Sequence, residues 1–135
     1  MQMLFVLIPL WIGIFHGQVV WNDSQASSAV GRFHLVSANG QSLPAVVAEN
    51  RSTGFKQEVI AGDAELRADR TCTVATEYRY TTDGEVSTSW SRDECTFATS
   101  GQEVRFKFRS GELVGTLQAD LLTVRADAEL VYRRR

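Results

Sequence analysis

Residues 71–92 read TCTVATEYRYTTDGEVSTSWSR, and this stretch decides the fold. Apolar and polar side chains alternate along its first half, where Tyr78 and Tyr80 flank Arg79. A period of two places one face of a strand in a core and the other face in water. The dipeptide Asp83-Gly84, which separates the two runs, is typical of a tight hairpin turn. The stretch therefore predicts two long antiparallel strands joined by a short loop.

The same alternation continues to the end of the chain, for example through Val104, Phe106 and Phe108. Glycine-containing turn signals such as Asn39-Gly40 separate the apolar runs, and no helical period of useful length follows the N-terminal leader. We therefore expect an all-β domain in which some neighbouring strands merge. The predicted strands lie near residues 31–37, 43–48, 55–61, 63–69, 71–81, 85–92, 94–99, 103–109, 112–118, 121–126 and 129–134.

An antiparallel meander of this length can protect its edges by closing into a small up-and-down barrel or by folding into a sandwich. A sandwich needs longer crossovers between its sheets, and only residues 38–43 and 48–55 could supply them. Because nearly every connection is a short hairpin, the sequence favours the barrel.

The register of the central hairpin has two solutions. With a two-residue loop, Asp83-Gly84, Cys72 lies opposite Cys95 but Trp90 points away from Tyr78 and Tyr80. With the three-residue loop 82–84, the large side chains share one face, and a β-bulge within residues 91–94 restores the pairing of the cysteines. We predict the second register, because it places the whole apolar set in the core.

The two cysteines, Cys72 and Cys95, are predicted to form one disulfide, because the chain also carries an export signal. The alternative is a pair of buried thiols in a cytoplasmic protein. A metal site is not expected, since His34 is the single histidine after the leader and no Cys-x-x-Cys spacing occurs. His34 lies between Phe33 and Leu35, so it is predicted to point to the polar face.

The apolar run MLFVLIPLWIGIF at residues 3–15 fits the core of a secretory signal peptide and is shorter than the roughly 20 residues that cross a bilayer. Small residues at Ser24 and Ala26 suggest cleavage after residue 26. We expect a signal peptide over residues 1–26, one domain over residues 27–135, a periplasmic or secreted location, and no stable membrane span after cleavage. Two alternatives are an uncleaved segment that tethers the chain to a membrane and a buried N-terminal element of the domain.

Composition excludes several function classes. The net charge of -2 gives no basic field for nucleic acid. No nucleophile elbow, phosphate-binding loop or dinucleotide fingerprint occurs, and the carboxylates follow strand alternation or turns. The sequence thus predicts no enzyme and no cofactor.

Aromatic side chains are predicted to converge inside the barrel, where they either fill the core or line a pocket for a small apolar ligand. The candidate ligand-binding residues, which all belong to the predicted strands, are Tyr78, Tyr80, Trp90, Phe106, Phe108 and Tyr132.

Three segments are similar to those of small bacterial secreted or lipoprotein-type domains with lipocalin-like, or calycin-like, β-barrels. They are FHLVSANGQSLP at residues 33–44, the hairpin that ends at Cys95-Thr96-Phe97, and residues 115–124 followed by 130–134. The resemblance spans residues 31–134. It implies a barrel with a capacity for a ligand, and it transfers no catalytic residue. The anchoring cysteine of lipoprotein members is missing here.

Two functions follow as hypotheses. The first is an exported, non-enzymatic barrel that binds a small apolar or amphipathic ligand. The second is a cell-envelope interaction or inhibitor module that acts through loops or a sheet edge, with residues 48–55 as the presenting loop and a protein partner that the sequence does not identify.

Overall fold

The computed structural model describes residues 28–135 and shows an all-β chain. The predicted signal peptide, residues 1–26, lies outside the described residues. The strands are β1 (Gly31–Ala38), β2 (Gln41–Ser42), β3 (Ala45–Asn50), β4 (Phe55–Leu66), β5 (Thr71–Thr82), β6 (Glu85–Ser100), β7 (Glu103–Phe108), β8 (Gly111–Gln118), β9 (Leu121–Arg125) and β10 (Glu129–Arg134). Two pairs of predicted neighbours are merged, so that β4 and β6 are each one long strand.

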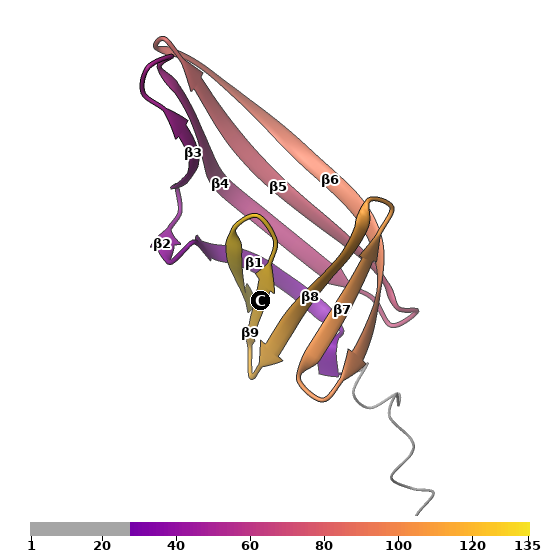
Figure 1. Ribbon diagram of the computed structural model, residues 1–135. Helices are drawn as coiled ribbons and strands as arrows, with labels where there is room; N and C mark the ends of the chain where they lie inside the picture. The colour runs from indigo at the N-terminus through magenta and orange to yellow at the C-terminus, as the bar shows by residue number, and fades with distance from the viewer. Residues whose placement is uncertain (1–27) are drawn as a thin grey trace, which may run out of the picture.

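The strands form an antiparallel meander from β4 to β10, and β1 closes it by pairing with β10 on one side and with β4 on the other (Figure 1). Eight strands, β1 and β4–β10, thus make a closed barrel, and the predicted fold class is confirmed. The two strands β1 and β4 approach each other closely at the point of closure. A Cβ atom at Gly62 would lie 2.9 Å from Leu35 Cδ2, so this position has no room for a side chain.

The core lies inside the barrel and comes from alternate residues of its strands, as the period of two predicts. Phe33 and Leu35 point inward and are buried, while His34 between them lies on the outer face, as expected. The largest fully buried side chains are Tyr132, Phe33, Phe106, Leu66, Leu122, Val59 and Val104.

The predicted register of the β5–β6 hairpin is wrong. The ladder runs without a bulge from Thr71 opposite Thr96 to Thr82 opposite Glu85, so the loop is the two-residue Asp83-Gly84. Asp83 and Gly84 have φ values of 50° and 85°, the pair of positive values that a type I′ turn requires. Trp90 therefore lies opposite Glu77 on the outer face, and not on the face of Tyr78 and Tyr80.

Three of the barrel strands continue well past its rim. The strands β4, β5 and β6 run beyond the short strands β7–β10, and β3 adds to the outer part of β4 (Figure 1). We call this part of the sheet the extension: residues 45–50 of β3, 55–59 of β4, 76–82 of β5 and 85–94 of β6. Its tip consists of two adjacent turns, since a Cβ atom at Gly54 would lie 2.8 Å from the Asp83 carboxylate.

Candidate interaction surface

The strand β6 has β5 as its single neighbour in the extension and gains β7 as a neighbour in the barrel. It pairs with β5 from Glu85 to Thr96, whereas β7 pairs only with residues from Cys95 to Ser100. Among the described residues, none pairs with the other side of residues 85–94, and all ten of these residues are exposed. We call this segment, residues 85–94, the β6 edge.

The backbone groups that the β6 edge offers can be assigned from its turn. In a two-residue hairpin the flanking residues, here Thr82 and Glu85, form a hydrogen-bonded pair, and bonded and non-bonded pairs then alternate along the ladder. The odd-numbered residues of β6 therefore bond to β5, as the donation from the Phe97 N–H to the Arg70 carbonyl at 3.0 Å confirms. The even-numbered residues, from Val86 to Glu94, direct their N–H and C=O groups away from β5 into open space.

The side chains of the β6 edge leave its centre unprotected. Residues 86–91, Val-Ser-Thr-Ser-Trp-Ser, contain no charge and no proline, and charged residues stand only at the two ends of the edge. Val86 and Trp90 are 60% and 53% exposed on the outer face. Proteins normally block a long free edge with a bulge, a proline or a central charge, because unpaired backbone groups are a template for another strand. Here none of these devices is present over six residues.

The opposite edge of the extension differs. The strand β3 is short, its ladder with β4 is interrupted by a bulge between Val46 and Ala48, and it carries Glu49 near its end. A turn closed by the Asn50 side chain follows, in which the Ser52 amide and hydroxyl both donate to Asn50 Oδ1. Residues 48–55, the predicted presenting loop, thus form the end of β3 and a tight turn at the tip. The β6 edge is the less protected of the two.

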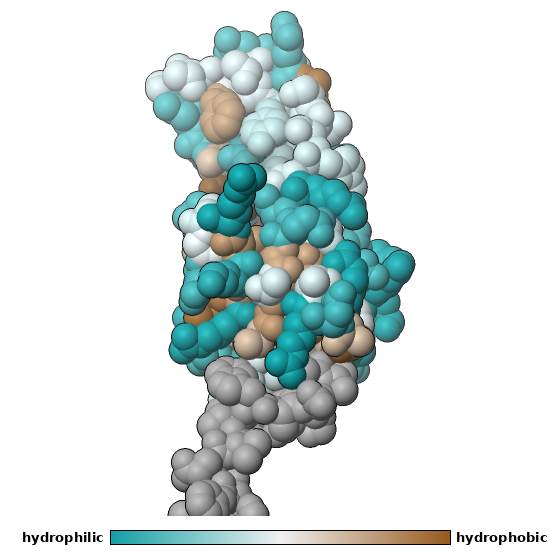
Figure 2. Space-filling model, turned by 90° about the vertical axis from the view of Figure 1, so that its right-hand side faces the viewer, coloured by the Kyte–Doolittle hydropathy of each residue, from teal (hydrophilic) through white to brown (hydrophobic). Residues whose placement is uncertain are grey.

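Small and aromatic hydroxyl side chains cover the inward-facing side of the extension. Ser87 and Ser89 lie opposite Tyr80 and Tyr78, and the two tyrosine rings are 6.1 Å apart. Partial burial raises the pKa of Tyr78, and the negative charges around it act in the same direction. Figure 2 shows one side of the molecule, on which pale, weakly polar surface covers much of the upper part while strongly hydrophilic side chains gather below.

Polar contacts on the outer face join neighbouring strands within the extension. Arg79 of β5 donates two hydrogen bonds to Glu58 of β4, from Nε at 3.0 Å and from an Nη at 3.1 Å. Glu58 is buried, and its hydrogen bonds with Arg79 hold the pKa of its carboxyl below the ordinary value. This pair joins the two central strands of the extension.

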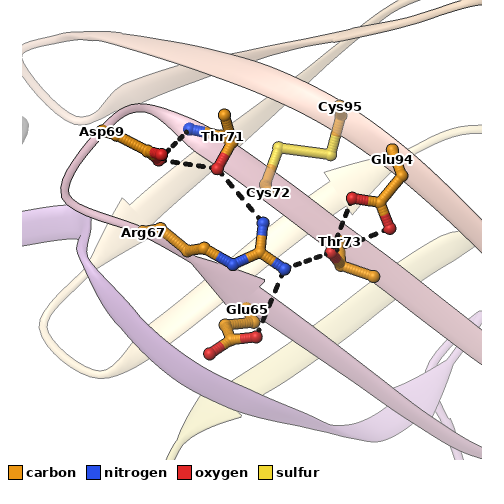
Figure 3. The surroundings of a disulfide bond; sticks show 8 residues. All are labelled: Glu65, Arg67, Asp69, Thr71, Cys72, Thr73, Glu94 and Cys95. Atoms are coloured by element: carbon orange, nitrogen blue, oxygen red, sulfur yellow. Dashed lines mark hydrogen bonds and ion pairs between the residues drawn. A yellow bond between two sulfur atoms is a disulfide. The ribbon is translucent and has the colours of Figure 1, made fainter.

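The predicted disulfide between Cys72 and Cys95 is present and joins β5 to β6 just where the β6 edge begins (Figure 3). Beside it, on the outer face, Arg67 donates to Thr71 and Thr73, and the Thr73 hydroxyl contacts both Glu94 carboxylate oxygens at 3.1 Å. The Thr71 hydroxyl and amide donate to Asp69, which lowers the pKa of that carboxyl. The base of the hairpin is therefore covalently and electrostatically fixed.

The structure separates the residues that were predicted to share one ligand site. Phe106, Phe108 and Tyr132 line the barrel interior, and burial raises the pKa of the Tyr132 phenol strongly. Tyr78 packs against this core, Tyr80 lies in the extension, and Trp90 lies on the outer face. The interior cavity that they were expected to line has a volume of about 60 Å³.

A larger hollow, of about 410 Å³, lies open on the outer face beside Trp90 and Arg92. Its charged side chains are mostly neutralised within it, because Arg135 pairs with Asp63 at 2.8 Å and Arg32 pairs with Glu65 at 3.3 Å. This hollow borders the β6 edge and offers neither an enclosed apolar volume nor a free cluster of one charge.

Residues 28–135 offer neither a metal-binding cluster nor a membrane-spanning helix. Within this range no group of three or more histidine, cysteine or acidic side chains is placed to bind a metal ion. The same residues include no helix whose length and apolarity would let it cross a membrane.

Comparison with known proteins yields no match among protein-family models, curated proteins or solved structures.

Proposed function

We propose that this chain is a non-enzymatic protein-interaction module that binds an extended polypeptide by adding it as a strand to the β6 edge. The observation that supports this function is the row of outward-directed backbone groups on residues 86–94, beside the exposed side chains of Val86 and Trp90. Strand addition of this kind takes its affinity from main-chain hydrogen bonds and its specificity from alternate side chains. The barrel supplies the rigid base from which the extension projects.

The alternative function, binding of a small apolar ligand inside the barrel, has less support. Sites for drug-sized ligands are typically about 300–1,000 Å³ in volume. The interior cavity of about 60 Å³ falls well below this range, and buried side chains such as Phe106 and Tyr132 line it. We therefore prefer the interaction module to the ligand carrier.

An extracytoplasmic location belongs to the same proposal. A disulfide such as Cys72–Cys95 is stable mainly in oxidising compartments, and the apolar leader at residues 3–15 fits export. The closed eight-stranded antiparallel barrel is compatible with a lipocalin-like domain, as the resemblance of the sequence implies.

Peptide display against two edge variants tests the function. The Thr88 N–H points away from β5, so Thr88→Pro removes an outward donor without breaking the β5–β6 ladder. Thr88→Val is the matched control, because it keeps the N–H and the preference for strand geometry. Peptides selected on the wild-type chain should bind Thr88→Val normally and Thr88→Pro at least about tenfold more weakly.

Folding of both variants is checked by circular dichroism. Equal affinity of the selected peptides for Thr88→Pro and Thr88→Val would contradict the proposal. So would a selection from a large library of extended peptides that yields no binder.

A further inference from the structure

We propose that the strand added to the β6 edge is the β6 edge of a second copy of this chain, in an antiparallel register centred on Thr88. This inference rests on the proposed function and names the partner for it. Its basis is the fit of the edge to itself, in backbone pairing, in side-chain pairing and in length.

Backbone pairing restricts where the twofold axis between the two copies of the β6 edge can lie. In an antiparallel ladder between two copies related by a twofold axis, the outward-facing even residues must bond to even residues. The axis can therefore lie between two copies of one edge residue. The choices near the middle of the edge are Thr88, Ser89 and Trp90.

The length of the free edge selects among these centres. The other side of β6 is occupied from Cys95 onward, where Phe108 of β7 lies opposite. A ladder centred on Trp90 would place Glu85 of the second copy opposite Cys95, a position that β7 already fills. A centre at Ser89 would place the turn residue Gly84 of the second copy opposite Glu94, against the end of β7. A centre at Thr88 places Gly84 opposite Arg92, and residues 85–91 of both copies pair in full.

Side-chain pairing favours the same centre. In a ladder centred on Thr88, Val86 of each copy lies directly opposite Trp90 of the other. This pair occurs twice, so both large exposed apolar side chains of each edge are covered. Directly opposed aromatic and β-branched side chains are among the stabilising cross-strand pairs. On the other face Ser87 meets Ser89, and Glu85 meets Ser91. Asp83 of one copy lies opposite Asp93 of the other only at the two ends of the ladder. There Arg92, which precedes Asp93 in sequence, supplies a positive charge.

The resulting assembly is a continuous sheet across two extensions, with the barrels at opposite ends. Its interface is isologous and closes after two copies, since each copy uses the one unbulged free edge of this length that residues 28–135 offer. The pairing removes the open edge that the monomer exposes.

Thiol crosslinking at two positions of one edge tests the register. In a ladder centred on Thr88, the two copies of residue 88 have Cα atoms about 5.5 Å apart. The two copies of residue 92 are separated by eight residue steps, about 26 Å. Thr88→Cys and Arg92→Cys are both exposed and on the same face, so a short thiol-specific crosslinker reaches each of them equally well in the monomer.

The wild-type chain is expected to dimerise as its concentration rises in sedimentation equilibrium, and Trp90→Ala is expected to weaken the dimer at least about tenfold. The crosslinker should yield a covalent dimer of Thr88→Cys and leave Arg92→Cys monomeric. A dimer crosslinked at residue 92, or equally at both positions, would overturn the register.

A wild-type chain that stays monomeric at hundreds of micromolar would overturn self-pairing. If selected peptides still bind and distinguish Thr88→Pro from Thr88→Val, strand addition stands and only the partner is wrong. If such peptides are also absent, both proposals fail.

Discussion

The two halves of β6 show how one strand can belong both to a core and to an exposed sheet edge. From Cys95 to Ser100 it pairs with β7, and on its other side with β5 as far as Thr96; in this half Cys95, Phe97 and Thr99 are buried. From Glu85 to Glu94 it has one neighbour and no buried residue. The alternation of buried and exposed side chains is kept only where β6 pairs with β7 and belongs to the closed barrel. The difference teaches that the outer half of β6 is held by β5 alone and leaves its other side open.

The largest expected effect separates these halves directly. Phe97→Ala removes an aromatic ring that is 4% exposed, and should lower the free energy of unfolding by about 3–5 kcal/mol. Trp90→Ala, on the same strand, should change it by no more than about 0.5 kcal/mol in the monomer. Urea unfolding at low protein concentration measures both. Equal losses would show that the two halves of β6 share one core.

The disulfide at the boundary between the halves should have the next largest effect. Cys72 and Cys95 are 23 residues apart, and a crosslink over such a loop stabilises by up to about 3 kcal/mol. The gain should be smaller here, because the type I′ turn already brings the strands together. The double variant Cys72→Ala/Cys95→Ala should therefore unfold at lower urea concentration, and reduction of the wild type should match it. Unchanged stability in both cases would contradict the assignment of a structural disulfide.

The smallest effect concerns the extension alone and depends on pH. The Arg79 hydrogen bonds lower the pKa of Glu58 in the folded chain. Its contribution to stability is thus fully present above the unfolded pKa, near 4.5, and is lost as pH falls through the lower folded value. Amide exchange of residues 56–59 and 78–81 should accelerate over this acidic range.

Glu58→Gln is the control for this pH dependence. It should cost on the order of 1 kcal/mol near neutral pH and flatten the acidic change. A variant that keeps the full pH dependence would show that another carboxylate is responsible.

The sequence was sufficient for the fold because the period of two recurs in every barrel strand. Phe106 and Tyr132 are predicted inside and lie inside, and the Cys72–Cys95 bond is confirmed. The predicted register of the β5–β6 hairpin was wrong at Trp90, because it assumed that every large apolar side chain is buried in the core. Two local signals pointed to the correct solution: the Asp83-Gly84 dipeptide, which favours a two-residue turn, and the direct opposition of the cysteines that this turn creates.

The candidate surface could not be predicted for a different reason. A free edge at residues 85–94 exists because β7 ends at Phe108, opposite Cys95, while β5 continues to Thr82. This mismatch in length depends on how strands far apart in the chain are aligned, and no local pattern encodes it. With the correct register, Trp90 is placed on the outer face, and a large apolar side chain at that position would have been a hint that this part of β6 is exposed.

The direct test of the β6 edge is residue-resolved amide hydrogen exchange along β6, measured by NMR at a concentration where the chain is monomeric. We predict slow exchange for Ser87, Ser89 and Ser91 and fast exchange for Val86, Thr88 and Trp90, and slow exchange for the three successive residues Cys95, Thr96 and Phe97, which are bonded on both sides. Slow exchange at both the even-numbered and the odd-numbered residues from 86 to 91, or fast exchange at the odd-numbered ones, would contradict the account.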